Sequence, residues 1–570
     1  MKKLLIHNLK LGLGHSKEDL DQALRHRLGL TAQAYPQLDY EIEGQSLDAR
    51  KQPLSYNYRL ALGPKLGRFL AEHKIRVKDA SWQDLPGLAA WEQRIRQQAK
   101  PGAGQRLVEP PVVVGSGPAG LMAAYGLALA GLRPYILEQG QAVEERAASV
   151  QDFWSSGELK PSSNVQFGEG GAGTFSDGKL TSRSKDPRQR AYLELLVRHG
   201  APRDILFRQH PHVGTDLMQR IIPRLRQTME DLGARFYFNT QVREIAYRKG
   251  SYRLCCQESL PTSEQVDSSG LNEVLTTPIL VLALGHSARP LFRQLRDLGL
   301  AMAAKPFAVG LRIEHPQSLI NQGRYHEASD LALSQAPEAD DLSSLPPANY
   351  QLKTQAASGR AVYTFCMCPG GLVVNASSEP GRLCVNGMSY HARNLSYANS
   401  AVLTTVGPSD FGEEALAGMI FQEHLEEEAY QLGQTSSSYK SLPFTAPLQT
   451  WADFSQSRWP CELGSYQGSV GPARVAAPLH ELFPPSLYRA LKEGIEQLGR
   501  QLPGFDTAEA LLTGVEARSS SPLRLLRDKT SLEALGLPGL YPAGEGAGYA
   551  GGIVSSALDG MRVAEAILAR

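Results

Sequence analysis

A glycine-rich turn beginning at residue 115 has the residue types and spacing of a phosphate-binding site. Residues 115–120 follow the pattern G-x-G-x-x-G, with an apolar run before them and a helix-forming segment after them. In such a strand–turn–helix the helix N-terminus faces the pyrophosphate of a dinucleotide. The first glycine forms the turn, the second lets the backbone approach the phosphates, and the third lets helix and strand pack closely. We therefore expect the dinucleotide to contact Gly115, Ser116, Gly117, Pro118, Ala119 and Gly120.

An acidic residue ends the next expected strand, which covers residues 133–138. This residue, Glu138, lies eighteen positions after Gly120. In a dinucleotide-binding unit a carboxylate at this point accepts hydrogen bonds from the ribose hydroxyls of the adenosine. The same carboxylate repels a 2′-phosphate, which argues against NADP at this turn. Gln139 is expected to contact the same nucleotide.

The C-terminal segment helps to distinguish FAD from NAD. An apolar strand over residues 540–545 ends in Gly544 and Glu545, and a glycine-rich turn and a helix follow. This element resembles one in flavoproteins of the glutathione reductase superfamily. The resemblance implies that Glu545 binds the ribityl or pyrophosphate region of FAD. It also implies that the helix start at Gly551, Gly552 and Ile553 faces the flavin and stabilises its reduced, negative form.

A third element has the same kind of resemblance. Residues 279–285 form an apolar strand that ends in Gly285, and Leu284 stands where that superfamily usually has threonine. The order of turn, central strand and C-terminal acid matches the superfamily. Because no second G-x-G-x-x-G follows, we expect no dedicated NAD(P) domain, although reduced NAD(P)H can still bind transiently as an electron donor.

Longer strings resemble one family more closely. They lie at residues 168–180, 310–316, 364–371, 386–389, 515–522 and 544–553. They are similar to those of a family of mostly uncharacterised FAD-dependent dehydrogenases, often named NAD(P)/FAD-dependent oxidoreductases. The likeness runs from about residue 3 to the C-terminus and names no substrate. It implies that Gly171 and Gly173 lie against the pyrophosphate or the flavin, and we also expect Val242 at the cofactor.

Four residues are candidates for catalysis, each with an alternative. Lys179 can lie near the flavin or a phosphate, or simply pair with Asp177. His286 can donate a proton near neutral pH or be structural. Arg518 can clamp a substrate carboxylate or hold Glu516.

Cys368 and its neighbour Cys366 are the last candidate, because a dithiol beside a flavin is a possible redox pair. At positions i and i+2 of an expected strand, however, both should point the same way, and a disulfide between them would be strained. A packed thiol pair near the substrate wall is therefore the alternative to a redox role. We expect no metal site, since a metal needs at least three ligands.

These residues need a fold that brings distant segments together. We expect an α/β protein with a Rossmann-like FAD-binding domain of the glutathione reductase type, an inserted mixed β/α substrate domain and an N-terminal ferredoxin-like α+β module. The module rests on the order β-α-β-β-α before the charged helix over 85–100. The expected boundaries are 1–100 for the module, 105–300 and 481–570 for the FAD-binding domain and 301–480 for the inserted domain, with a linker at 101–104.

Composition limits the partners. The chain has 570 residues, a formal net charge of +1 and six cysteines. A net charge this close to zero creates no electric field that would attract nucleic acid or an acidic membrane. Six cysteines are too few for a disulfide framework in a chain of this length, which indicates reduced thiols and a cytoplasmic location. The expected partner is a small-molecule substrate, and a protein partner for the N-terminal module is a further candidate. The expected reaction is hydride transfer between a small organic substrate and FAD; the alternatives are an NAD(P)H-dependent flavin monooxygenase and a flavin-stabilised binding or assembly protein.

Overall fold

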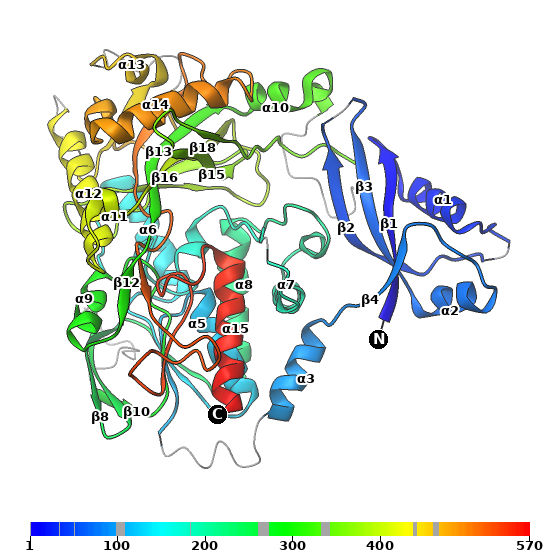
Figure 1. The fold of residues 1–570 in the computed structure, drawn as a ribbon, viewed down its shortest axis with the longest axis horizontal. Coiled ribbons are helices and arrows are strands. Elements are labelled where there is room, and N and C mark those ends of the chain that lie inside the picture. The colour runs from blue at the N-terminus through cyan, green and yellow to red at the C-terminus, as the bar shows by residue number, and fades with distance from the viewer. Residues whose placement is uncertain are drawn as a thin grey trace.

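The structure is a computed structural model. It describes residues 2–33, 35–50, 52–98, 109–182, 184–259, 273–331, 343–436, 442–459 and 467–570. The expected linker at 101–104 lies outside these residues. Figure 1 shows a small N-terminal part to one side, joined to two larger parts stacked on each other.

A five-stranded parallel sheet organises the first of the larger parts. Its order is β23-β11-β5-β6-β7, and every neighbouring pair is parallel. The segments that follow β5, β11 and β23 therefore leave the sheet at one common edge, where ligands of open α/β sheets bind. The strands are β5 (Val112–Val114), β6 (Tyr135–Leu137), β7 (Arg235–Tyr237), β11 (Leu280–Leu282) and β23 (Leu540–Pro542).

Two helices from opposite ends of this part pack face to face. Helix α5 (Pro118–Leu129) is buried almost all round, and α15 (Ile553–Ala569) lies against it. Small residues make the approach possible, because a Cβ at Gly560 would collide with the carbonyl of Ala119. The other helices here are α6 (Val143–Ser156), α7 (Arg188–Arg198), α8 (Thr215–Asp231) and α9 (Arg289–Asp297).

A seven-stranded sheet forms the other large part, in the order β14-β15-β18-β13-β21-β19-β20. Helices α12 (Ala417–Thr435) and α14 (Pro485–Gly499) pack against it. Strand β21 belongs to this sheet although it lies beyond residue 480, the end expected for the inserted domain. The strands are β13 (Phe307–Pro316), β14 (Lys353–Gln355), β15 (Ala361–Cys368), β18 (Tyr397–Val406), β19 (Ala446–Thr450), β20 (Arg474–Ala476) and β21 (Leu511–Glu516).

The N-terminal module has two helices and an antiparallel sheet in the order β2-β3-β1-β4. Helix α1 begins with a capping box between Ser16 and Asp19. Strand β4 was not expected, because its half-exposed residues become a strand only by pairing with β1. The elements are β1 (Lys2–Gly12), α1 (Lys17–Leu28), β2 (Tyr40–Asp48), β3 (Ser55–Leu62), α2 (Pro64–Glu72) and β4 (Ala80–Asp84).

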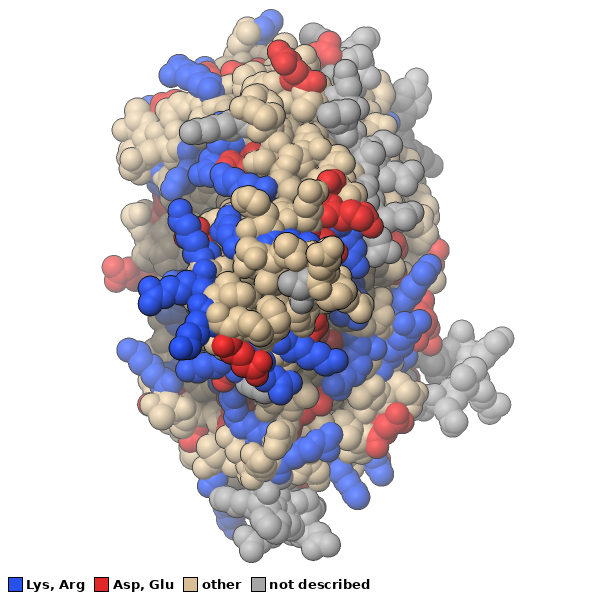
Figure 2. Space-filling view, turned by 90° about the vertical axis from the view of Figure 1, so that its right-hand side faces the viewer, with Lys and Arg blue, Asp and Glu red and all other residues tan. Residues whose placement is uncertain are grey.

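Helix α3 (Leu88–Gln98) leads from this module to the parallel sheet. Figure 2 looks onto the module, where Lys and Arg side chains stand out with Asp and Glu between them. No helix in the described ranges is long and apolar enough to cross a membrane.

Smaller elements fill the remaining chain. Strands β8 to β10 form a three-stranded sheet, while β12 pairs with β22 and β16 with β17. These strands are β8 (Thr240–Arg248), β9 (Ser251–Glu258), β10 (Val274–Thr277), β12 (Met302–Ala304), β22 (Leu523–Leu525), β16 (Leu372–Asn375) and β17 (Val385–Met388). The short helices are α10 (Gln317–Tyr325), α11 (Pro408–Phe411) and α13 (Trp451–Ser455).

Candidate functional site

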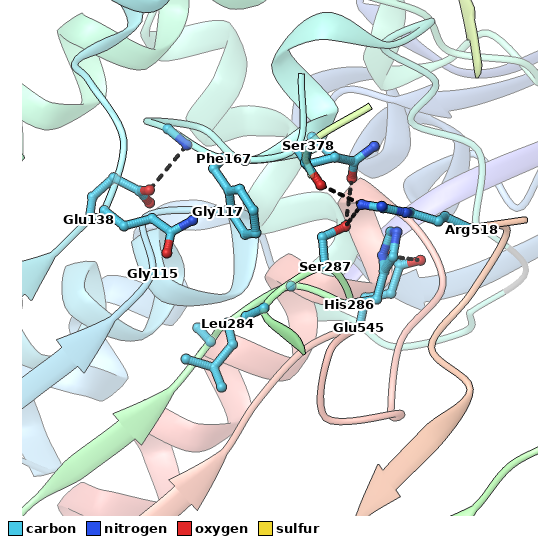
Figure 3. Close-up of a pocket in the computed structure, with 18 of the residues that line it drawn as sticks. Gly115, Gly117, Glu138, Phe167, Leu284, His286, Ser287, Ser378, Arg518 and Glu545 are labelled. Atoms are coloured by element: carbon cyan, nitrogen blue, oxygen red, sulfur yellow. Dashed lines mark hydrogen bonds and ion pairs between the residues drawn. The ribbon is translucent and has the colours of Figure 1, made fainter. Parts of the chain in front are cut away.

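A cavity of about 590 Å³ opens at the carboxyl edge of the parallel sheet. This volume lies within the usual range for small-molecule and cofactor sites. Its walls come from segments far apart in the sequence (Figure 3). Most of the expected cofactor residues line it: Gly115, Gly117, Pro118, Ala119, Glu138, Gln139, Gly171, Gly173, Val242, Gly285, Glu545, Gly551, Gly552 and Ile553.

The glycine turn has the geometry that its sequence predicts. Gly115 has a φ of +100°, a conformation that favours glycine. A Cβ at Gly120 would collide with the carbonyl of Gly115, so glycine is needed where α5 meets the turn. At Gly117, by contrast, the nearest protein atom to an added Cβ would be the Cα of Gly171 at 3.7 Å. Protein packing therefore does not require glycine at position 117. The remaining reason for a glycine there is the cavity in front of it, because a ligand in that cavity would lie close to the backbone.

Two residues of the turn do not face the cavity directly. Ser116 is fully buried behind it, and Gly120 is enclosed in α5. Ser116 donates to Glu138 Oε2 from its backbone nitrogen at 3.0 Å and from Oγ at 2.8 Å. We therefore correct the expectation that all six turn residues contact the ligand. Ser116 and Gly120 shape the turn from behind.

Glu138 is already well bonded within the protein. Besides the two bonds from Ser116, its Oε1 accepts hydrogen bonds from the backbone nitrogens of Gly140 at 3.0 Å and Gly168 at 3.1 Å. A carboxylate offers about four lone-pair sites, and these four donors use them all. Ribose hydroxyls could thus bond to Glu138 only by replacing a protein donor, and the rotatable Ser116 hydroxyl is the replaceable one.

The loop at residues 168–175 is held against the turn. A Cβ at Gly171 would lie 3.0 Å from the Cα of Gly117, and one at Gly173 would lie 2.8 Å from Cγ1 of Ile553. Glycines at these positions therefore let the loop meet both the start of α5 and the start of α15. The expected contact of Gly171 and Gly173 with the cofactor itself stays a prediction.

One buried arginine, which the sequence did not reveal, organises this loop. The guanidinium of Arg146 donates to the carbonyls of Asn164, Val165, Glu169 and Gly171 at 2.7 to 2.9 Å. Arg146 is 0% exposed; the carbonyls of Glu169 and Gly171 also accept from Thr174, whereas no other donor to those of Asn164 and Val165 is found among the described residues. Sequence patterns do not reveal this role, because backbone carbonyls are present at every position.

The C-terminal strand and helix complete the cavity. Gly544 is not on the cavity wall; it has a φ of +78°, and its nitrogen donates to Asp559 at 2.8 Å. Gly551, Gly552 and Ile553 bring the N-terminus of the 17-residue helix α15 to the wall. The unpaired N–H groups and the dipole of a helix N-terminus favour negative charge there.

His286 and Glu545 lie together on the wall (Figure 3). His286 Nδ1 is 3.7 Å from Glu545 Oε1. Burial, followed by the charges of Arg518 and Arg289, lowers the pKa of His286 to about 3. The expected titration near neutral pH is therefore wrong, since this imidazole is neutral at pH 7. Burial instead raises the pKa of Glu545 to about 7.

Arg518 does not pair with Glu516. It forms a two-point ion pair with Glu426 on α12, at 2.8 and 2.7 Å, and also donates to Ser287 and Ser378. The expected pairing with Glu516 is therefore wrong, whereas the substrate clamp stays a prediction, because Arg518 lies on the cavity wall. Glu516 pairs instead with the buried Arg312, at 2.6 Å.

Lys179 and Cys368 lie behind the wall. Lys179 pairs with Asp177 at 3.3 Å and donates to the carbonyl of Met367. The structure thus has the pairing with Asp177 that was the second of the two expectations for Lys179. Cys368 is 0% exposed, whereas Cys366 lines the cavity. The strand register shifts between Phe365 and Cys368, and Cys366 has a φ of +46°, yet the two side chains still form a hydrogen bond with each other, as a packed thiol pair would.

The chemistry of the donor set fits a dinucleotide with a redox-active end. Residues 111–202 match a family model described as "FAD binding domain", and residues 306–519 match one described as "FAD-dependent protein, C-terminal domain-like". A protein of Clostridium beijerinckii, named "Uncharacterized protein", is 40% identical over 566 residues, which cover 99% of this chain and 98% of that protein. The chain belongs to a family of FAD-dependent oxidoreductases.

Solved flavoprotein structures resemble the family's fold only distantly. A flavoprotein/dehydrogenase from Cytophaga hutchinsonii is 10% identical, covers 81% of this chain and 77% of its own, and has a TM-score of 0.32. Glycine oxidase from Geobacillus kaustophilus is 12% identical, covers 80% of this chain and 93% of its own, and has a TM-score of 0.29. Neither similarity bears on the substrate of this chain.

Proposed function

We propose that this protein transfers a hydride between a small organic substrate and bound FAD. The supporting observation is the convergence of the glycine turn, the 168–175 loop and the start of α15 on one cavity. FAD, when bound, supplies the group that accepts and returns the hydride. The protein's own contribution is to bind, orient and handle protons.

Each wall of the cavity has a separate task in this proposal. Gly117 and the α5 N-terminus hold the pyrophosphate, and Glu138 holds the adenosine ribose. The α15 N-terminus at Gly552 stabilises negative charge on the reduced cofactor. The 168–175 loop, held by Arg146, keeps these groups in register.

Two carboxyl groups on the wall are suited to holding a proton near neutral pH. Burial raises the pKa of both Glu545 and Glu516 to about 7. Each is therefore partly protonated at pH 7, and Glu545 has the neutral His286 beside it. We propose Glu545 as the group that exchanges a proton with substrate during hydride transfer.

An anaerobic stopped-flow screen tests this function. Purified protein is mixed with NADH, NADPH and candidate metabolites, and bleaching of the oxidised flavin is recorded. We expect one compound to reduce the bound flavin far faster than it reduces free FAD. If none does, a flavin-stabilised binding protein is the better description. A hydroxylated product on reoxidation with O2 would favour a monooxygenase.

The proton-handling role has its own matched pair of variants. Glu545→Gln should remove the step near pH 7 from the pH profile of flavin reduction. Glu428→Gln changes an exposed carboxylate on α12 and should leave the profile unchanged. An unchanged profile in Glu545→Gln would rule out this role while leaving hydride transfer itself open.

The proposal also covers the domain types and the domain boundaries of the fold. We infer a glutathione reductase-type FAD-binding domain around the parallel sheet, an inserted domain that extends to about residue 519, and a ferredoxin-like module from β1 to β4. The extended boundary is supported by β21, which lies in the seven-stranded sheet, and by the family match over 306–519. A protein partner for the module, NAD(P)H as donor and a cytoplasmic location stay predictions.

A further inference from the structure

A second cavity lies where the N-terminal module meets the rest of the chain. This module-side cavity has a volume of about 160 Å³. Strands β2 and β3 contribute Leu47 and Tyr56, and the body of the protein contributes residues 204–212, the end of α10 and the 391–393 loop. None of its residues lines the 590 Å³ cavity, so its ligand is not the flavin.

Arg393, a buried arginine of this cavity, has an ion-pair partner but no hydrogen-bond acceptor for its side chain among the described residues. Arg393 is 9% exposed, yet its guanidinium donates no hydrogen bond to any residue within the described ranges, and its Nε is fully buried. The nearest carboxylate oxygen is Asp177 Oδ2 at 3.6 Å, which also lies 3.3 Å from Lys179 Nζ. Asp177 shares its charge between Arg393 and Lys179 without accepting a hydrogen bond from Arg393, so the guanidinium keeps open donors that a further anion could use.

A buried histidine beside Arg393 leaves a second polar atom open. His212 Nε2 donates to the carbonyl of Tyr390 at 3.1 Å, so the neutral ring carries its proton there. Its Nδ1 is buried without a hydrogen-bond partner among the described residues, 3.8 Å from Asp177 Oδ2. The ring stacks on His391 with centroids 6.0 Å apart, which fixes its orientation.

Positive charge is in excess around this cavity. Asp204 is the acid on its wall, and it is bonded to Arg208 at 2.7 Å. Arg324, at the end of α10, lies on the same wall, is exposed and forms no ion pair with any residue that the structure describes. The cavity thus offers one arginine deep inside and a second, exposed one. Tyr325 and Pro346 add carbon surface to the wall.

We infer that the module-side cavity binds a small dicarboxylate. One carboxylate would take the open donors of Arg393 and the other would pair with Arg324, since arginine recognises carboxylates through two parallel hydrogen bonds. The volume, roughly half of the ~300 Å³ typical of larger ligand sites, limits the compound to a few heavy atoms. The carbon walls suit methylenes between two charges better than a compact phosphate.

Calorimetric titration of the full-length, FAD-loaded protein at pH 7 tests this inference. The probes are sodium succinate, sodium propionate and inorganic phosphate at equal ionic strength. We expect succinate to bind about tenfold or more tightly than propionate, because the second charged hydrogen-bond pair is lost in propionate. Phosphate should bind more weakly than succinate.

Two variants locate the site, and a third is the control. Arg393→Gln should abolish succinate binding, and Arg324→Gln should reduce it to the level of propionate. Arg248→Gln removes an exposed arginine on β8 and should change nothing. Because Arg393→Gln could disturb the fold through Asp177, the melting temperature of this variant is measured as well. If the variant is destabilised, Arg324→Gln still tests the site, because Arg324 is exposed and its substitution should not affect folding.

Three results would overturn the inference. They are no succinate binding at millimolar concentration, equal affinity for phosphate and succinate, or unchanged affinity in Arg324→Gln. Flavin content and flavin reduction are read separately, so failure here is distinguishable from failure of the proposed hydride transfer.

Discussion

Substitution of Gly117 by alanine separates cofactor binding from folding. In the protein alone the new methyl would lie 3.7 Å from the Cα of Gly171, an ordinary contact, and Gly117 has an extended φ of −72°. Gly117 is the N-cap of α5, so the change to alanine costs the apoprotein about 1 kcal/mol. The fold should therefore survive.

The cost to bound FAD should be much larger. Overpacking by one methyl costs about 1–3 kcal/mol, and losing a hydrogen bond to a charged phosphate costs about 1.5–3 kcal/mol. With roughly 2.5–6 kcal/mol in total, affinity for FAD should fall by about 70-fold to 25,000-fold. Flavin absorbance of the purified protein, and fluorescence titration with FAD, measure this loss.

Two further glycine variants make the comparison sharp. Gly120→Ala should instead reduce the melting temperature of the apoprotein, because its methyl would collide with the Gly115 carbonyl. Gly407→Ala alters another N-cap glycine, at α11, where no atom lies within 4 Å of the new methyl, and should keep its flavin. Full yellow absorbance and wild-type affinity in Gly117→Ala would refute the assignment of the pyrophosphate to this turn.

Three other predictions follow from buried groups. Arg146→Lys cannot reach all four loop carbonyls, so FAD affinity should fall at least tenfold by fluorescence titration. Iodoacetamide at pH 7 should label Cys366 before Cys368 in peptide mass spectra; the hydrogen bond from Cys368 lowers the pKa of the Cys366 thiol, and burial raises that of Cys368. Burial lowers the pKa of His315 to about 4, below the ~6.5 of the unfolded chain, so its stabilisation is lost as pH falls from 6.5 towards 4. His315 alone should contribute a loss of about 2 kcal/mol between pH 7 and pH 5 in urea titrations, so His315→Phe should lose about that much less than the wild type.

The sequence predicted the parts of the site that depend on consecutive residues. The turn from Gly115 to Gly120 lies in one strand–turn–helix, so its glycine spacing carries the whole signal. Glu545 and the start of α15 were likewise found from a local string. Their meeting at one sheet edge follows from the parallel strand order, which alternating β and α segments favour.

Side-chain partners were predicted less well, since they depend on contacts between distant segments. Glu426 lies on a helix 92 residues from Arg518, and nothing near Arg518 in the sequence marks it as the partner. The register shift before Cys368 could not be predicted from the sequence either. A strand pattern assigns side-chain direction by strict alternation, and a bulge interrupts that alternation. One extra residue in the bulge leaves Cys366 on the cavity wall and Cys368 fully buried behind it.

The neighbouring positions of β5, β11 and β23 also bear on how the protein is made. A ribosome completes the glycine turn about 420 residues before it reaches β23 and α15. At bacterial to eukaryotic elongation rates this delay is roughly 20–80 s, during which the turn is present without the C-terminal wall of its cavity. FAD bound by all three segments would then hold together the two ends of a domain interrupted by another.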